Sequence, residues 1–373
     1  MADDQTAVAE VAEIPPPSEV KATPLPFPEH YDPNLTTLHA ANYERLASDA
    51  YAWKEKHNLT TADTNICVIP IDVQIFQFSG LPLQQGAAEA ARKGVEWGYK
   101  WMHKIGMWAP TMETEAVHQI FHASFFVDEN GKHPALGVKI TEEELGTKWH
   151  ANIAAIRAVY PDMDETKMDA GYMYLRQYLR WYTKSLGEQG RGMVVQPYQG
   201  QLGGIDHALL PALHEMIFFS EVARDFDRTT IVKGGNKLTQ SFAPQGPDIK
   251  TDHLNRVLDH DGKARRSLEK LLSKYTYTII FGFPSSSSVK AFGDQLIEQY
   301  KENPGLLGRI YFLKSCCAPS IPVVDATQTP PVTLVDNPKI AEDAFAAFAA
   351  AGMHVIEDEN LPLDEWPGMD LLA

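Results

Sequence analysis

Residues 275–289, with the sequence YTYTIIFGFPSSSSV, contain the clearest structural signal in this chain of 373 residues. The first half is rich in β-branched and aromatic residues, which is typical of a buried strand. Gly282 and Pro284 then favour a sharp turn, and helical spacing follows the serine run. A strand-to-helix elbow of this kind raises one side chain above the sheet and directs a helix N-terminus at it. The sequence therefore predicts an elbow whose serine run, residues 285–288, can present a side chain for chemistry.

Short apolar runs alternate with segments of helical spacing on both sides of this elbow. The predicted strands are residues 65–74, 105–112, 192–196, 229–233, 275–281 and 309–313, with a short last strand at 354–356. The predicted helices are residues 37–57, 86–103, 165–186, 207–224, 289–300 and 338–351. Such alternation is typical of a doubly wound α/β fold, so we expect a mainly parallel six-stranded sheet with helices on both faces. Pro110 predicts a bend or an end within the second strand, because proline cannot donate to a ladder.

Three further regions flank or interrupt the predicted domain, which we place at residues 37–360. Residues 1–36 are rich in proline and predict an extended arm, either disordered or held against a neighbouring chain. Residues 123–190 form an irregular insertion that contains a long aromatic helix at 165–186. Residues 361–373 are predicted to be a C-terminal tail.

The composition is that of a globular protein, with 44% hydrophobic and 22% charged residues. The net charge is −16 and there is no basic stripe, so nucleic acid is not an expected partner. No apolar run approaches the roughly 18 residues that span a bilayer. The N-terminal residues match neither a secretory signal nor an arginine-rich transit peptide. The three cysteines, Cys67, Cys316 and Cys317, make no disulfide framework, which indicates a reducing, intracellular compartment.

The carboxyl ends of the predicted strands collect residues that can carry chemistry. Asp72 and Lys233 each end a strand, and the loop 285–288 follows another. Ligands of doubly wound sheets bind beyond such strand ends. We therefore expect these residues to converge with the segment 112–115. A purely structural ion pair is the alternative interpretation of Asp72 and Lys233.

Several motifs make the chain resemble the isochorismatase-like cysteine hydrolases, and most of all their nicotinamidase-related branch. In chain order they are IDVQ at 71–74, QIFHASFF at 119–126, GGIDHALLPAL at 203–213, VKGGNKLT at 232–239 and FAAAGMHV at 348–355. The resemblance extends from about residue 37 to residue 356. It implies the same doubly wound fold.

In that family an aspartate, a lysine and a cysteine form the reactive centre. The resemblance implies Asp72 as the proton acceptor and Lys233 as the cation that supports the nucleophile. The family's Gly-x-x-x-Ser-His-Cys-Val aligns with residues 282–289, so Ser287 and Ser288 replace the histidine and the cysteine. A thiol with a pKa of about 8.5 is shifted toward thiolate by an ammonium and a helix N-terminus, whereas a serine hydroxyl is far less acidic. The resemblance thus predicts a vestigial triad of Asp72, Lys233 and Ser288.

The resemblance also implies an altered metal site. Nicotinamidase-like members bind a divalent ion through Asp-x-His and a later histidine, and these positions align with Glu113, Glu115 and His122. Two glutamates and a histidine suit a harder ion, but the longer side chains would misplace it. The family's Trp-Pro-x-His-Cys loop has become QPYQG at residues 196–200, which removes a further polar residue. No cofactor is therefore expected, and a divalent metal at Glu113, Glu115 and His122 is the alternative.

Two functions remain open, and the first is a hydrolase-like domain without catalysis, retained as a structural subunit of a larger assembly. The resemblance adds that this fold serves as a non-catalytic accessory subunit in mitochondrial assemblies, including ATP synthases of flagellate protists. We then expect contacts with other subunits through residues 1–36 and the aromatic helix 165–186. The expected location is mitochondrial, or otherwise cytoplasmic, with at most peripheral association with a membrane complex.

The second function is amide hydrolysis by Ser288 with Asp72 and Lys233, as in nicotinamidases. Ser–Lys hydrolases exist on other folds, but they need a neutral lysine, and a lysine beside a carboxylate stays charged. An engineered Cys→Ser trap of an active enzyme is a variant of this hypothesis. The simultaneous changes at residues 113, 115, 199, 200 and 287 argue against a trap, which needs one change. We therefore favour a chain that is not an enzyme.

Overall fold

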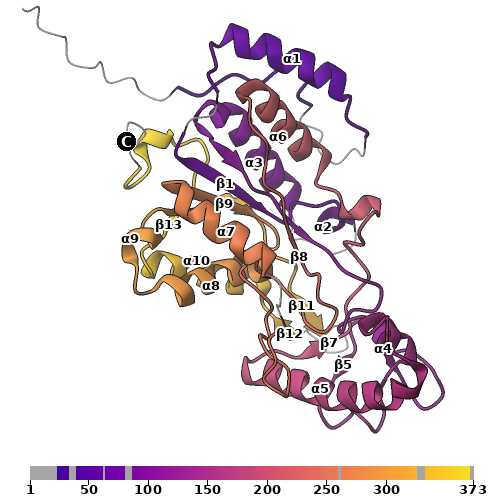
Figure 1. The fold of residues 1–373 in the computed structure, drawn as a ribbon. Coiled ribbons are helices and arrows are strands. Elements are labelled where there is room, and N and C mark those ends of the chain that lie inside the picture. Colours follow the sequence, from indigo (N-terminus) through magenta and orange to yellow (C-terminus); the bar gives the residue numbers. More distant parts are fainter. Residues whose placement is uncertain are drawn as a thin grey trace, which may run out of the picture.

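The computed structural model describes residues 23–32, 39–61, 64–79, 86–258, 262–325 and 332–369. Within these ranges an α/β body holds most of the helices and strands, and a smaller lobe lies at one end of the molecule (Figure 1). The central sheet and the helices that cover it belong to the body, whereas α4 and α5 belong to the lobe.

A parallel sheet of five strands, in the order β13–β10–β9–β1–β2, forms the centre of the body. The strands are β1 (Ile66–Ile71), β2 (Met107–Trp108), β9 (Tyr277–Gly282), β10 (Ile310–Cys317) and β13 (His354–Ile356). β1 and β9 pair along their whole length, so that Ile71 lies opposite Gly282. Every residue of these two strands is buried, as expected for central parallel strands covered on both faces.

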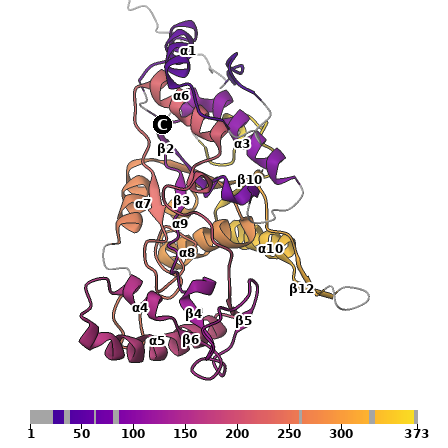
Figure 2. The same ribbon diagram turned by 90° about the vertical axis from the view of Figure 1, so that its right-hand side faces the viewer.

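Helices cover both faces of this sheet (Figures 1 and 2). On one side lie α1 (Tyr43–Lys56), α3 (Ala87–Trp101) and α6 (Pro211–Arg224), and on the other lie α7 (Lys263–Lys274), α8 (Lys290–Tyr300) and α10 (Asn337–Ala350). Successive side chains of a strand point to opposite faces. Accordingly, Val68 of β1 joins the core with α3 and α6, whereas Cys67 and Ile69 join the core with α7, α8 and α10. The predicted α/β architecture is therefore confirmed.

The prediction of six strands in one sheet is wrong, because the described sheet has five and ends at β2. Beyond Pro110, β3 (Thr111–Glu113) pairs in parallel with β8 (Ile231–Lys233) as a separate two-stranded sheet. Proline has no N–H to donate, so the ladder is interrupted where Pro110 predicted a bend or an end. β8 still lies along this edge, since Ile231 N donates to Pro110 O at 2.9 Å.

The lobe contains the predicted insertion. Its elements are α4 (Ile153–Val159), α5 (Met168–Glu188) and the antiparallel pairs β4 (Phe126–Val127) with β6 (His150–Ala151) and β5 (Lys139–Ile140) with β7 (Met193–Val194). The predicted strand at 192–196 therefore belongs to the lobe and not to the central sheet. The lobe has its own apolar core, which Leu238 and Ile249 from the chain after β8 help to form.

Tyrosine side chains of α5 bond this helix to the loop that follows β8. Tyr174 OH donates to Asp252 Oδ2 at 2.8 Å, and Tyr178 OH donates to Leu238 O. Tyr182 is fully buried. This tyrosine face is therefore occupied within the chain, and a partner contact through residues 165–186 stays a prediction.

The segments predicted as arm and tail both contact the body where the structure describes them. Residues 1–22 and 33–36 of the predicted arm lie outside the described residues. In the described part of the arm, Leu25 N donates to Lys100 O of α3 at 2.8 Å, and Tyr31 OH donates to Glu96 Oε1 at 3.1 Å. In the tail, Trp366 is buried, and its ring lies 6.0 Å from that of Trp97.

Shorter elements complete the described chain. They are α2 (Phe76–Ser79), α9 (Pro304–Leu307), the short helices η1 (Met102–Lys104), η2 (Ala123–Phe125), η3 (Glu165–Lys167), η4 (Ile205–His207), η5 (Ser285–Val289) and η6 (Leu363–Glu365), and the strands β11 (Val323–Asp325) and β12 (Val332–Val335). β11 and β12 form a hairpin that projects from the body (Figure 2). Within the described ranges, every helix is too short or too polar to cross a bilayer.

Candidate functional site

A buried ion centre lies at the carboxyl ends of β1, β3 and β8. Lys233 Nζ lies 2.7 Å from Asp72 Oδ2 and also pairs with Glu113 Oε2. The Lys233 and Asp72 side chains are each 1% exposed. Lys233 Nζ donates further to Phe242 O at 2.7 Å and lies 3.3 Å from Ser241 O. Two carboxylates and two backbone carbonyls thus surround an ammonium that has three N–H donors.

Asp72 is held by backbone geometry and by Thr111. The residue directly after β1 has a φ of +48°, in the left-handed region that few non-glycine residues adopt. Thr111 Oγ1 donates to Asp72 Oδ1 at 2.6 Å and accepts from Asp72 N at 3.1 Å. Strained residues of this kind persist only where the surroundings determine them, and they often cluster at functional sites.

Glu113 is the third ionisable residue of this centre. Its backbone is fixed by Gln74, whose Oε1 accepts from Glu113 N at 2.7 Å and whose Nε2 donates to Glu113 O at 3.1 Å. Burial raises the pKa of Glu113 to about 8, although Lys233 acts to lower it and Asp72 raises it further. Burial alone would lower the pKa of Lys233, but Asp72 and Glu113 raise it above its usual range. At neutral pH we therefore expect a charged lysine and a protonated Glu113.

Ser288 lies in the elbow between β9 and α8, as the sequence predicted. It is buried within η5, and the preceding strand β9 is the direct neighbour of β1. In the part of the chain that the structure describes, Ser288 makes no hydrogen bond with Asp72 or Lys233. The three predicted site residues therefore lie at strand ends of the body, and the ion pairs and hydrogen bonds of the described chain join Asp72 to Lys233 but neither of them to Ser288.

The elbow offers few free backbone donors. Pro284 has no N–H, Ser285 N donates to Ala318 O at 2.9 Å, and Ser287 N and Val289 N both donate to Pro284 O at 3.2 Å. An oxyanion hole needs N–H groups that point at the developing charge. These four elbow positions therefore contribute none.

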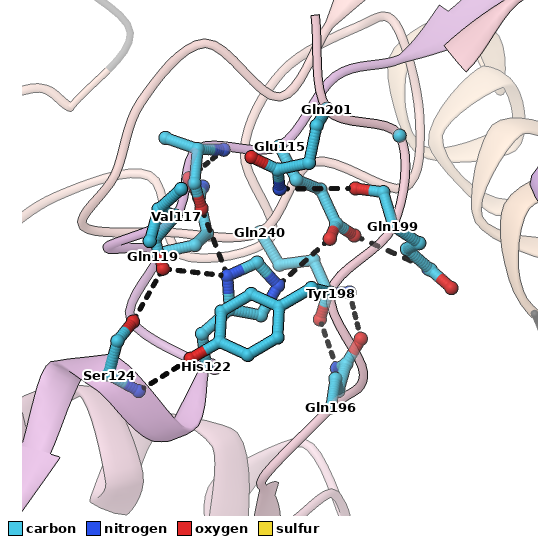
Figure 3. A network of polar contacts seen from close by, with 12 residues as sticks. Glu115, Val117, Gln119, His122, Ser124, Gln196, Tyr198, Gln199, Gln201 and Gln240 are labelled. Atoms are coloured by element: carbon cyan, nitrogen blue, oxygen red, sulfur yellow. Dashed lines mark hydrogen bonds and ion pairs between the residues drawn. The ribbon is translucent and has the colours of Figure 1, made fainter. Parts of the chain in front are cut away.

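A second buried polar network surrounds His122 (Figure 3). His122 Nδ1 donates to Ala116 O at 2.9 Å, and its Nε2 lies 2.9 Å from Glu115 Oε2. Gln199 Nε2 donates to Glu115 Oε1 at 3.3 Å. The ring of Tyr198 lies over His122 with 4.6 Å between ring centroids. Burial raises the pKa of Glu115, while the hydrogen bond with His122 acts to lower it.

The three predicted metal ligands belong to two different networks. Glu113 faces Lys233, whereas Glu115 and His122 bond to one another. Across the described residues, no three histidine, cysteine or carboxylate side chains are placed to hold a metal ion. These residues therefore do not fit a resident divalent ion. Lys233 already pairs with Glu113, and His122 and Gln199 already bond to Glu115.

Two residues of this site were missed from the sequence. Thr111 bonds to Asp72, and Gln74 fixes the backbone of Glu113. Gln74 belongs to the IDVQ motif, and Thr111 lies two residues before Glu113, on the same face of β3. Both residues can therefore be found in the sequence, but the residue that each one bonds to lies 39 positions away in the chain.

No protein-family model and no curated protein matches this chain. Among solved structures, the yeast nicotinamidase Pnc1p bound to nicotinaldehyde is 12% identical, with a TM-score of 0.44, covering 79% of this chain and 100% of that one. A nicotinamidase/pyrazinamidase of Acinetobacter baumanii is 11% identical, with a TM-score of 0.41, covering 79% and 96%. A putative isochorismatase hydrolase from Oleispira antarctica is 11% identical, with a TM-score of 0.37, covering 80% and 95%. The structural neighbours are thus nicotinamidase and isochorismatase-family hydrolases, at a level of similarity that concerns the fold alone.

Proposed function

We propose that this chain is a catalytically silent α/β domain that serves as a structural subunit of a larger protein assembly. The observation that carries the proposal is the saturation of Lys233. Its ammonium is bound by Asp72, Glu113 and a backbone carbonyl, and none of these groups bonds to Ser288 within the described chain. A mitochondrial ATP synthase is the assembly that the sequence resemblance suggests.

The chemistry of serine activation supports this proposal. A serine nucleophile needs an adjacent base within hydrogen-bond reach. Lys233 is charged, and Asp72 accepts from Thr111 and pairs with Lys233, so neither is bonded to Ser288 in the described chain as a base would be. The elbow positions described above also lack free donors for an oxyanion. An Asp–Lys pair in this state can stabilise a fold without catalysing a reaction.

Amide hydrolysis by Ser288 is the second candidate, and one observation favours it. Asp72 adopts a left-handed backbone conformation at the carboxyl end of β1, beside the strand that carries the serine elbow. Strain of this kind is a frequent property of active sites. For catalysis, Asp72 would have to exchange its bond with Lys233 for one with Ser288 or a water molecule.

Ammonia release from nicotinamide by the purified full-length chain separates the two candidates. We expect no turnover by the wild type or by Ser288→Cys, because a thiol alone does not free Asp72 from Lys233. Turnover by the wild type that disappears in Ser288→Ala would overturn the proposal in favour of the second candidate.

Native purification tests the positive half of the proposal. Under mild detergent we expect the chain to migrate with a complex far larger than its own mass, together with other subunits. Recovery only as a free monomer would contradict the subunit function, whatever the activity assay shows.

A further inference from the structure

A cleft lies between the body and the lobe, beside the ion centre, and Lys233 and Ser241 belong to both. Its volume is about 870 Å³, and it is lined by β8, the loop that follows β8, the beginning of α7, and Tyr160 and Tyr174 of the lobe. Pockets of roughly 300–1,000 Å³ are typical of small-molecule sites, and the carboxyl end of a strand is a common place for them. Val232 and Lys233 of β8 both line the cleft, and the ammonium of Lys233 is directed to Asp72.

Arg256 presents an oriented guanidinium to this cleft. Its Nε donates to Asp252 Oδ2 at 2.7 Å, and its Cζ lies 4.8 Å from the ring centroid of Tyr174. These two contacts fix the plane of the guanidinium, and apart from Asp252 no carboxylate pairs with it in the described ranges. A fixed guanidinium with free terminal N–H groups suits a carboxylate or a phosphate, which it can bind through two parallel hydrogen bonds.

Asp252 is the carboxylate in the described lining of the cleft, and its acceptor positions and its charge are engaged by neighbouring groups. Oδ1 accepts from Leu254 N and Arg256 N at 2.8 Å each, and Oδ2 accepts from Tyr174 OH at 2.8 Å as well as from Arg256 Nε. Four donors fill the acceptor positions of one carboxylate. Among the described lining residues, Lys233, Lys237, Arg256 and Lys263 outnumber Asp252, so their summed charge is positive, although the chain as a whole carries −16.

Lys237 supplies a second cation to the lining of the cleft. Its Nζ donates to Ala158 O at 2.8 Å, and it has no carboxylate partner among the residues that the structure describes. One bond leaves two of its three N–H groups for a ligand. The ring of Tyr160 lies 6.0 Å from that of Tyr174, so the wall near the two cations is aromatic.

From this geometry we propose that the cleft binds a small organic anion, in which a flat apolar body carries a carboxylate or a phosphate. Arg256 and Lys237 bind the oxyanion, and Tyr160 and Tyr174 contact the apolar body. The inference is independent of catalysis at Ser288, because neither Ser288 nor Asp72 lines the cleft.

Calorimetric titration of the full-length chain at low salt tests this inference. The probes are phenyl phosphate, benzoate and inorganic phosphate. Phenyl phosphate against benzoate compares the two oxyanions, and phenyl phosphate against inorganic phosphate tests whether the ring is needed. We expect saturable binding of phenyl phosphate, of benzoate, or of both, and weaker binding of inorganic phosphate. Lys237→Met and Arg256→Lys should each weaken binding by about tenfold or more, the effect of removing a hydrogen bond to a charged group.

Lys250→Met is the matched control. Lys250 lies on the same long loop, but it pairs with Glu298 and does not line the cleft. It should bind the probes as the wild type does, and thermal melting of each variant checks that it is folded. If no probe binds saturably, or if Lys237→Met and Arg256→Lys bind like Lys250→Met, the proposal is wrong. Binding of inorganic phosphate alone would also overturn it.

Discussion

Lys233 Nζ and Asp72 Oδ2 lie 2.7 Å apart where both side chains are 1% exposed, and they join β8 to β1 across β3. The attraction between such charges is strong, but each had to leave water to reach the interior. The net contribution of a buried pair is therefore small, whereas removal of one partner leaves the other charge uncompensated. Under our proposal that the site is not catalytic, this asymmetry is enough to keep both residues in the fold.

Lys233→Met should destabilise the protein strongly. The substitution leaves the Asp72 carboxylate buried without its cation, and loss of one partner of a buried pair costs about 3–5 kcal/mol. Urea denaturation followed by circular dichroism measures the free energy of unfolding. The control is Lys250→Met, which breaks an exposed pair with Glu298 and should change that free energy by less than about 1 kcal/mol. Equal stability of the two variants would contradict a central role for the buried pair.

Glu113 should make the stability depend on pH. Burial raises its folded-state pKa from 4.5 to about 8, so the folded state binds this proton more tightly than the unfolded state does. The stabilisation is complete below the unfolded pKa and is lost as pH rises through the folded pKa. We therefore expect a contribution to the free energy of unfolding that declines between about pH 4.5 and pH 8.

Glu113→Gln tests this pH dependence, because an amide does not titrate. Denaturation curves at several pH values should show a flatter decline for Glu113→Gln than for the wild type. Glu298→Gln changes an exposed carboxylate and should keep the wild-type slope. Parallel pH profiles of Glu113→Gln and the wild type would show that Glu113 is not protonated in the folded protein.

Two glycine-to-alanine substitutions in helices should have opposite effects. A Cβ on Gly293 of α8 would lie 2.2 Å from ring atoms of Phe348, which is fully buried on α10. Overpacking of this kind costs about 1–3 kcal/mol. A Cβ on Gly187 of α5 would have no neighbour within 4 Å, so Gly187→Ala should stabilise by about 0.4–1 kcal/mol through the unfolded state. Thermal melting compares the two, and a stabilising Gly293→Ala would show that α8 and α10 are less closely packed than described.

Tyr178→Phe should loosen the attachment of α5. Its hydroxyl donates to Leu238 O in a fully buried position, so the change leaves this carbonyl without that donor and costs about 1–3 kcal/mol. Tyr172→Phe, whose hydroxyl makes a 3.3 Å contact with His150 Nδ1 in a half-buried position, should have a smaller effect. Hydrogen exchange of the α5 amides is the measurement. Unchanged protection in Tyr178→Phe would mean that apolar packing alone holds the helix.

Much of the body could be predicted, because the spacing of apolar residues along a short stretch of sequence indicates which side chains are buried. The continuous apolar runs that end at Asp72 and at Gly282 became the central strands β1 and β9. Helical spacing located the helices that cover them, and the elbow after Gly282 placed Ser288 at the start of α8. These features depend on residues close together in sequence.

The tertiary structure decided two things that the sequence did not. These are which residues pair with the charged side chains, and which sheet each strand belongs to. Glu113, expected as a candidate metal ligand, instead pairs with Lys233, which lies 120 residues away. The run at 192–196 has a strand pattern, yet its pairing partner is β5 of the lobe. Local sequence specifies which residues become buried in a strand or a helix, because burial follows a short period. It does not specify which distant charge or strand edge arrives beside them, because the tertiary path of the chain determines that.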